Sequence, residues 1–225
     1  MKLYMHPVSM TTRPVRLFAA ENKIAMDEEL IDLMTGAHLQ PPYSKINPNC
    51  LVPMLVDGDL KLTESSAILK YLADKIGSPA YPKDLKQRAK VNEAMDWINA
   101  NFYRDWGYNL CYPQIFPHLK RRSDEAQAAT LEFGKENAKR WLGLLDSYWL
   151  GPNKPYLCGN DITIADYFGS GIVTLGEAIG VDFTPYPNVT RWLERMKALP
   201  SWNSVNEVFY GLVGSLKGQK FVTLS

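Results

Sequence analysis

A short segment rich in breakers of regular structure, Gly-Ser-Pro-Ala-Tyr-Pro-Lys-Asp at 77–84, divides the chain into two unlike parts. Glycine and proline interrupt helices and strands, so this composition predicts a linker. Before it, short apolar runs alternate with turn formers, whereas from Leu85 to Tyr210 no alternating strand pattern occurs. We therefore predict two domains, 1–78 and 85–225, joined by a linker at 79–84.

The first domain reads as a small sheet with helices. The predicted elements are a strand at 2–5, a helix through about Asn22, a strand at 29–33, strands at 54–56 and 60–62, and a helix after Thr63. The Asp57-Gly58 pair is a strong hairpin signal between the last two strands, and Thr63 is a candidate N-cap. The order βαβ followed by ββα is that of a thioredoxin-like domain.

The second domain is predicted to be all-helical. Helical spacing of apolar residues runs through about 85–110, 123–150, 164–179 and 189–199. Within it, Thr163 and Asp166 have the spacing of a capping box, which bears on folding rather than on chemistry. The predicted fold class is therefore α/β followed by all-α.

Composition narrows the class of function. The 225 residues carry a net charge of +1, which offers no basic field for nucleic acid. No apolar run reaches the length of a secretory signal or a membrane span, so we expect a soluble, cytoplasmic protein with no membrane partner. The three cysteines are far apart and form no C-x-x-C pattern, which argues against a metal site.

Two features of the first domain together indicate a site for a peptide. Val52-Pro53, preceded by Leu51, stands at the start of a strand, where a proline donates no ladder hydrogen bond and a cis bond is favoured in a tight turn. We expect this to leave the Val52 N–H and C=O free. Glu64-Ser65 opens a helix, whose first N–H groups and positive dipole end attract a carboxylate.

In order and spacing, these features resemble the glutathione-binding signature of the cytosolic glutathione S-transferase family, and the likeness is to serine-type members of the phi and theta kind. The resemblance implies that Leu51, Val52 and Pro53 hold the cysteinyl part of glutathione, and that Glu64 and Ser65 hold its γ-glutamyl end. It further implies glutathione as co-substrate without a metal, and a homodimer.

By the same resemblance, the loop at 6–16 supplies the group that activates the thiol. A free thiol has a pKa of about 8.5, so a hydroxyl that donates a hydrogen bond to the sulfur favours the reactive thiolate. Counted back from Val15, Ser9 occupies the serine position of the phi-type motif, whereas theta- and delta-type spacing counted back from Arg16 falls on Thr12. Ser9 is our candidate for the hydroxyl that contacts the sulfur, with Thr12 and Thr11 as alternatives. The competing interpretation is that these hydroxyls only cap the first helix.

His38, in Gly36-Ala37-His38, has the register of a histidine that contacts the glycine carboxylate of glutathione in phi-type enzymes. The sequence departs from the family at Leu51, where relatives often carry a polar side chain. Lys45 is a candidate substitute for that polar contact.

The stretch at 102–112 is unusually aromatic for the helix that faces the site in this family. Stacked aromatic rings suit a flat electrophile, and Tyr103, Trp106 and Tyr108 are the candidates for that site. At helical spacing, the same residues also fit an ordinary core.

The sequence therefore predicts a glutathione transferase in which the thiolate attacks a small hydrophobic electrophile. Substitution, dehalogenation, isomerisation and peroxide reduction all use that thiolate. The alternative is a non-catalytic module of the same fold that binds a ligand or docks a partner, because function resides in the site rather than in the fold.

Overall fold

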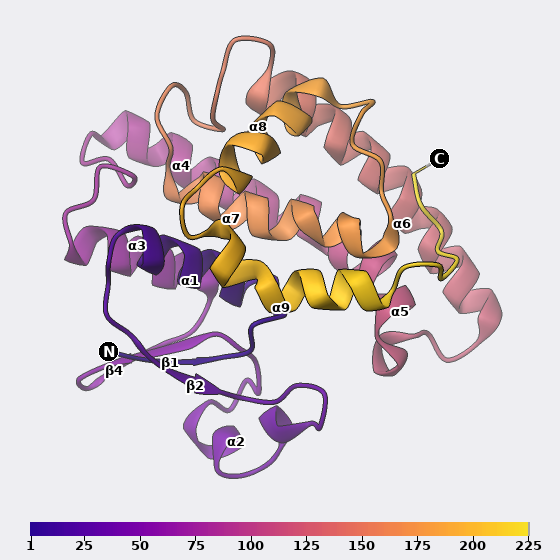
Figure 1. Cartoon of the computed structure of the whole chain (residues 1–225), viewed down its shortest axis with the longest axis horizontal. Helices are drawn as coiled ribbons and strands as arrows, with labels where there is room; N and C mark the ends of the chain where they lie inside the picture. Colours follow the sequence, from indigo (N-terminus) through magenta and orange to yellow (C-terminus); the bar gives the residue numbers. More distant parts are fainter. Residues whose placement is uncertain (225) are drawn as a thin grey trace.

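The computed structural model describes residues 1–224 and consists of a small sheet domain below a larger helical domain (Figure 1). The elements of the first domain are β1 (Lys2–Met5), α1 (Thr12–Glu21), β2 (Asp27–Leu30), η1 (Ala37–Leu39), α2 (Tyr43–Ile46), β3 (Met54–Asp57), β4 (Leu60–Leu62) and α3 (Ser65–Lys75). Those of the second are α4 (Leu85–Trp97), η2 (Ile98–Phe102), η3 (Arg104–Cys111), α5 (Tyr112–Ile115), η4 (Pro117–Leu119), α6 (Asp124–Leu144), η5 (Leu145–Leu150), α7 (Ile164–Val173), η6 (Thr174–Ile179), α8 (Pro187–Lys197) and α9 (Trp202–Ser215). The segment at 76–84 carries neither helix nor strand.

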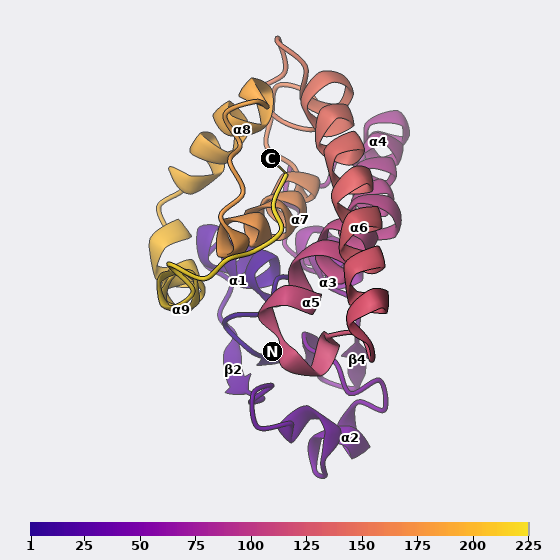
Figure 2. The same cartoon turned by 90° about the vertical axis from the view of Figure 1, so that its right-hand side faces the viewer.

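The four strands form one mixed sheet in the order β2-β1-β3-β4. β1 pairs with β2 in parallel and with β3 antiparallel, and β3 pairs antiparallel with β4. Leu3 and Met5 of β1 are buried, while Lys2 and Tyr4 are only half-buried, as the period of two in a strand requires. In both ribbon views α1 and α3 lie between the sheet and the helical domain, and α2 lies beyond the sheet (Figures 1 and 2). The predicted thioredoxin-like order is confirmed.

The helical domain is built around α7, whose residues are all buried. α4, α6 and α8 surround it (Figure 2). α1 of the sheet domain approaches α7 closely at Gly171, where a Cβ atom would lie 2.6 Å from Cγ of Pro14.

Within residues 1–224, no helix has the length and apolar character needed to cross a bilayer.

Arg13, near the start of α1, links the two domains. Its side chain is buried, with 1% of the residue exposed, and its guanidinium donates to Asn206 Oδ1 and Thr174 Oγ1, both at 2.9 Å, and to the Gly171 carbonyl. The Cζ atom of Arg13 also lies 3.7 Å from the centroid of the Phe209 ring. Burial lowers the pKa of Arg13 to about 10, so the side chain is still charged at neutral pH. These contacts replace much of the lost hydration, although Arg13 Nε is buried without a partner in the described residues, and they attach α1 to α7 and α9.

Three details differ from the sequence-based expectation. β2 spans Asp27–Leu30 rather than 29–33, because all four side chains of this edge strand are exposed and none marks it by alternation. The residue before α3 is Glu64, so Thr63 is not its N-cap. α9 was not predicted, because a polar residue, Asn206, stands among its buried positions to meet Arg13.

The carboxylate of Asp166 organises the start of α7. It is fully buried and accepts hydrogen bonds from the N–H groups of Leu157 and Thr163 at 2.8 Å, from the Thr163 hydroxyl at 2.9 Å and from Trp192 Nε1 at 3.0 Å. It therefore ties the predicted capping box to the preceding loop and to α8.

We expect Asp166→Ala to lower the free energy of unfolding by about 3 kcal/mol, because it leaves several buried donors without an acceptor. Asp161→Ala, at an exposed residue five positions earlier, is the matched control and should change it by less than about 0.5 kcal/mol. Urea unfolding of both variants measures the difference. Equal changes in the free energy of unfolding for the two variants would show that the hydrogen bonds of Asp166 do not stabilise the start of α7.

Candidate active site

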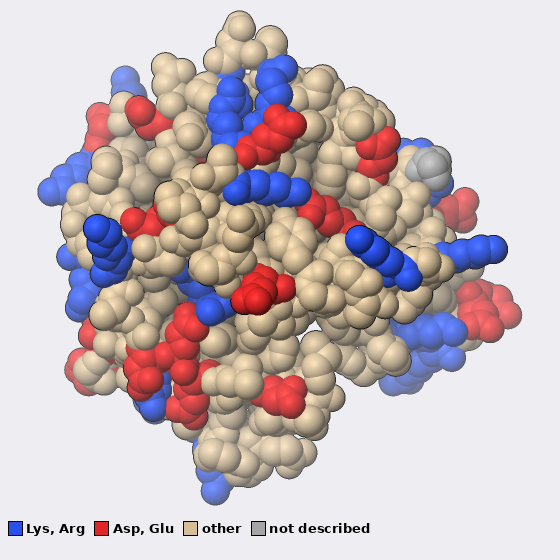
Figure 3. All heavy atoms as spheres, viewed as in Figure 1, with Lys and Arg blue, Asp and Glu red and all other residues tan. Residues whose placement is uncertain are grey.

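Two adjoining cavities lie between the domains. The polar cavity has a volume of about 280 Å³ and is lined by residues that include Val52, Pro53, Glu64 and Ser65. The apolar cavity, of about 360 Å³, is lined mostly by aliphatic and aromatic side chains. Both are bordered by Thr11, Leu51, Val52, Tyr103 and Tyr108. A hollow is visible between the lobe of η1 and α2 and the lobe of α5 and η4 (Figure 3).

The Leu51-Val52-Pro53 segment forms one edge of the polar cavity, and the Val52-Pro53 bond is cis. Within residues 1–224, the Val52 N–H has no hydrogen-bond acceptor. The expectation that the Val52 carbonyl is also free is wrong, because it accepts a hydrogen bond from Thr11 Oγ1 at 3.2 Å. The Leu51 carbonyl is held by Tyr43 Oη and by Asn47 Nδ2, while 58% of Leu51 stays exposed.

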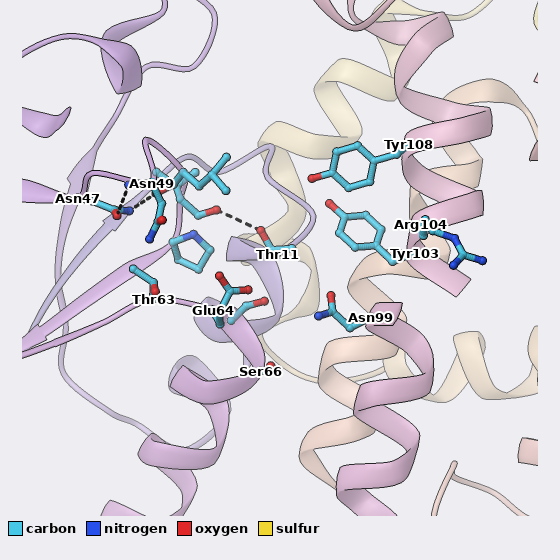
Figure 4. A pocket seen from close by; sticks show the side chains of 14 residues that line it. Thr11, Asn47, Asn49, Thr63, Glu64, Ser66, Asn99, Tyr103, Arg104 and Tyr108 are labelled. Atoms are coloured by element: carbon cyan, nitrogen blue, oxygen red, sulfur yellow. Dashed lines mark hydrogen bonds between the residues drawn. The ribbon is translucent and has the colours of Figure 1, made fainter. Parts of the chain in front are cut away.

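Glu64 lies opposite this edge and has an unusual backbone conformation. Its φ of +62° is in a region that non-glycine residues rarely adopt, and such outliers are concentrated at functional sites. The turn brings Glu64 to the cavity and starts α3 at Ser65, whose first-turn N–H groups have no partner within the helix. Figure 4 shows the Glu64 carboxylate facing the space below Thr11. This end of the cavity can bind both an ammonium group and a carboxylate.

The three hydroxyls of the loop before α1 have different environments. Thr11 borders both cavities and Ser9 borders the apolar one, with 3.1 Å between their hydroxyl oxygens. Ser9 Oγ also accepts a hydrogen bond from the Thr12 N–H, at the start of α1, at 3.3 Å. Thr12 is fully buried and lines neither cavity. Only Ser9 and Thr11 can therefore reach a molecule in the site.

The opposite wall is a cluster of three tyrosines. Ring centroids of Tyr103, Tyr108 and Tyr112 lie 5.2 to 6.0 Å apart, and the hydroxyl oxygens of Tyr103 and Tyr112 are 2.5 Å apart. Burial raises the pKa of Tyr103 and of Tyr112 well above the usual value, so both stay protonated and act as donors. Tyr103 and Tyr108 project from the helix wall toward Thr11 (Figure 4).

The expectation for Trp106 is wrong. Trp106 is completely buried, donates from Nε1 to the Ile172 carbonyl and lines neither cavity. The reason is that η2 and η3 are wound as π-helices, in which residues five apart face the same way. Tyr103 and Tyr108 therefore share a face, which Tyr112 extends, whereas Trp106, selected with them for the aromatic character of the stretch, has the core position that was the competing interpretation.

His38 lines the apolar cavity, together with His118. Burial, and then the nearby His118, lower the pKa of His38 and favour its neutral form at pH 7. Lys45 lines neither cavity. Asn49 and Asn99, which we did not select from the sequence, line the polar cavity. The signal for Asn49 was its place two residues before Leu51, and that for Asn99 was its place four residues before Tyr103, on the same helix face.

Metal ligands are not gathered anywhere in the described part of the chain, since no three His, Cys, Asp or Glu side chains lie close enough to hold an ion. The polar groups of the site are instead one carboxylate, the guanidinium of Arg104, several amides and hydroxyls, and the backbone N–H groups described above. They suit binding of a small peptide.

Comparison with known proteins agrees with this geometry. Residues 1–74 match the model of the glutathione S-transferase N-terminal domain, and residues 110–200 match that of the glutathione S-transferase C-terminal domain. The chain belongs to the glutathione S-transferase family. It is 34% identical over 205 residues to glutathione S-transferase theta-1 of Homo sapiens, covering 88% of this chain and 82% of that protein.

Other family members resemble the chain over most of its length. Glutathione S-transferase T3 of Arabidopsis thaliana is 33% identical over 223 residues, and the match covers 93% of this chain but 37% of that longer protein. The crystal structure of human glutathione transferase theta-2, in complex with glutathione and an unknown ligand, superimposes with a TM-score of 0.85 at 28% identity. That match covers 98% of this chain and 92% of the theta-2 chain.

Gly107 makes room for the tyrosine cluster. A Cβ atom at this position would lie 2.6 Å from Tyr103 Cε2 and 3.4 Å from Tyr112 Cε2. We expect Gly107→Ala to lower the free energy of unfolding by about 1–3 kcal/mol, because the buried Tyr103 ring must move. Gly143→Ala, in α6, is the control: no atom lies within 4 Å of its added Cβ, and a gain of about 0.5–1 kcal/mol is expected. Urea unfolding compares the two, and a neutral Gly107→Ala would contradict the close packing.

Proposed function

We propose that the protein is a glutathione transferase that activates the glutathione thiol for attack on a small hydrophobic electrophile. The observation that supports this most is the meeting of a peptide-sized polar cavity and an apolar cavity at Thr11 and Val52, beside the hydroxyl of Ser9. A sulfur bound at that junction has a donor on one side and the second substrate on the other. Bringing the two reactants together in this geometry lowers the barrier to reaction.

Glutathione is held along the polar cavity in this proposal. The free N–H of Val52 pairs with the cysteinyl backbone, as a strand edge pairs with an added peptide. The Glu64 carboxylate binds the γ-glutamyl ammonium, and the N–H groups at the start of α3, with the Ser65 hydroxyl, bind the γ-glutamyl carboxylate. His38 is assigned to the glycine end.

Ser9 is the proposed catalytic residue, because the acceptor of its proton is the Thr11 hydroxyl, at 3.1 Å, and a thiolate bound beside it can replace that acceptor. Thr11 already donates its proton to the Val52 carbonyl, and the Thr12 hydroxyl is sealed in the interior. Ser9 Oγ accepts from the Thr12 N–H at the positive end of α1, which favours donation of the Ser9 proton to an anion. A hydrogen bond from Ser9 to sulfur lowers the thiol pKa toward neutral pH, so more of the bound glutathione is thiolate.

The second substrate occupies the apolar cavity. No Asp, Glu, Lys or Arg lines that cavity among the described residues, so it suits a neutral, hydrophobic electrophile. Tyr103 and Tyr108 border both cavities and present hydroxyl groups near the reacting centre. Tyr108 is the more accessible, with 47% of its surface exposed. The homodimer and the cytoplasmic location implied by the family resemblance are parts of the same proposal.

Retention on immobilised glutathione, together with conjugation of 1-chloro-2,4-dinitrobenzene, tests the activity. We expect both binding and turnover. Retention without conjugation of this or other electrophile classes would contradict an enzyme and support a glutathione-binding module. Light scattering of the same sample tests the dimer.

We expect Ser9→Ala to lower kcat for conjugation about 10- to 100-fold, because a hydrogen bond to a charged group is worth about 1.5–3 kcal/mol. The pH profile of the rate should also move to higher pH, because the bound thiol regains a higher pKa.

Thr12→Val and Ser65→Ala are the comparisons for Ser9→Ala. Thr12→Val should leave the pH profile in place, and Ser65→Ala should mainly raise KM for glutathione. An unchanged rate in Ser9→Ala with a large loss in Thr11→Val would transfer the catalytic role to Thr11.

A further inference from the structure

Two histidines border the apolar cavity, one from each domain. His38 lies in η1 of the sheet domain and His118 in η4 of the helical domain. η1 and η4 belong to the two lobes on either side of the hollow in Figure 3. The proposed function uses His38 alone, so His118 is left without a role.

The two imidazoles lie close enough to interact, and no counter-ion accompanies them. Burial, and next the nearby His118, lower the pKa of His38. The other titratable groups of the lining are the phenols of Tyr103, Tyr108 and Tyr112, and no Asp, Glu, Lys or Arg of the described chain borders this cavity. Neither imidazole has a hydrogen-bond partner among the described residues. A bound anion would supply both the acceptor and the charge that the protein does not.

The glycine end of glutathione needs such partners in this chain. Leu51 is 58% exposed but offers no polar group at the position where relatives often carry one, and Lys45 lines neither cavity. With its γ-glutamyl end at Glu64 and its cysteinyl part at Val52, an extended tripeptide directs its glycine past Val52, away from Glu64. Leu51 and Val52 border both cavities, so that direction leads to the apolar cavity and its two histidines.

We propose that His118 joins His38 in binding the glycine carboxylate of glutathione, so that this end of the tripeptide is held between the two domains. The assignment rests on the proposed function and adds to it a residue of the helical domain. The carboxylate accepts a hydrogen bond from each ring and stabilises the protonated imidazoles.

Proton uptake is the signature that separates this pair from a passive wall. In the free protein His38 is mainly neutral at pH 7, because burial and His118 lower its pKa. A carboxylate bound beside it raises that pKa, so binding at neutral pH takes up a proton from the buffer. A carboxylate carried by the electrophile is the other source of such an anion, and the test distinguishes the two.

Isothermal titration calorimetry of the full-length protein with S-methylglutathione, which has no thiol proton to lose, tests the proposal. The matched ligand is its glycinamide, in which a carboxamide replaces the glycine carboxylate. We expect His118→Phe, which keeps a ring against Phe116, to weaken S-methylglutathione about three- to tenfold and to leave the glycinamide unchanged. Titrations in phosphate and in Tris, which differ in ionisation enthalpy, should show proton uptake at pH 7 that is smaller in His118→Phe.

Lys120→Gln is the control, because it removes a positive charge two residues from His118 but outside the lining, and it should change neither affinity. Equal affinity of wild type and His118→Phe for S-methylglutathione, or an equal loss for the glycinamide, would overturn the assignment and leave glutathione binding intact. An effect of His118→Phe confined to KM for 4-chloro-3,5-dinitrobenzoate, an electrophile with a carboxylate, would also overturn it. Failure of wild type to bind S-methylglutathione would contradict the proposed function itself, and the assignment with it.

Discussion

The buried charge of Arg13 is the interaction on which the arrangement of the site depends. The residue is the second of α1, close to the loop that carries Ser9 and Thr11, and its guanidinium is surrounded by groups from α7, η6 and α9. In the described chain it has no carboxylate partner, so its charge is stabilised by a carbonyl, a hydroxyl, an amide and an aromatic face. Because those groups belong to the helical domain, the position of Ser9 and Thr11 is tied to the second domain.

The second constraint is the π-helical winding of the wall opposite that loop. Five-residue spacing places Tyr103 and Tyr108 on one face, and Gly107 leaves space for the Tyr103 ring. The same winding turns Trp106 into the core against α7. The hydroxyl groups of Tyr103 and Tyr108 thus line the boundary between the cavities. Burial raises the pKa of Tyr103, so its hydroxyl stays protonated at neutral pH, and Arg104 of the same wall is paired with Asp105.

Much of the site was predictable because it consists of local motifs. Val52-Pro53 and Glu64-Ser65 line the polar cavity, and the roles proposed for them use mainly their own backbone groups, so they could be recognised from a few consecutive residues. Tyr112 was missed because an α-helical period places it on the opposite side from Tyr103. Asn99, four residues before Tyr103, was missed because a single amide carries no signal of its own. The Val52 carbonyl was judged free because its partner, Thr11, is 41 residues away in the chain.

The sequence by itself determined most of the order of strands and helices and the two motifs that line the polar cavity, since these follow from short-range periodicity and turn chemistry. Only the tertiary structure decided which of the three hydroxyls, and which aromatic residues, border the cavities. Each of these depends on packing between elements distant in sequence, where hydrogen bonding and burial are set by neighbours that the local pattern does not specify.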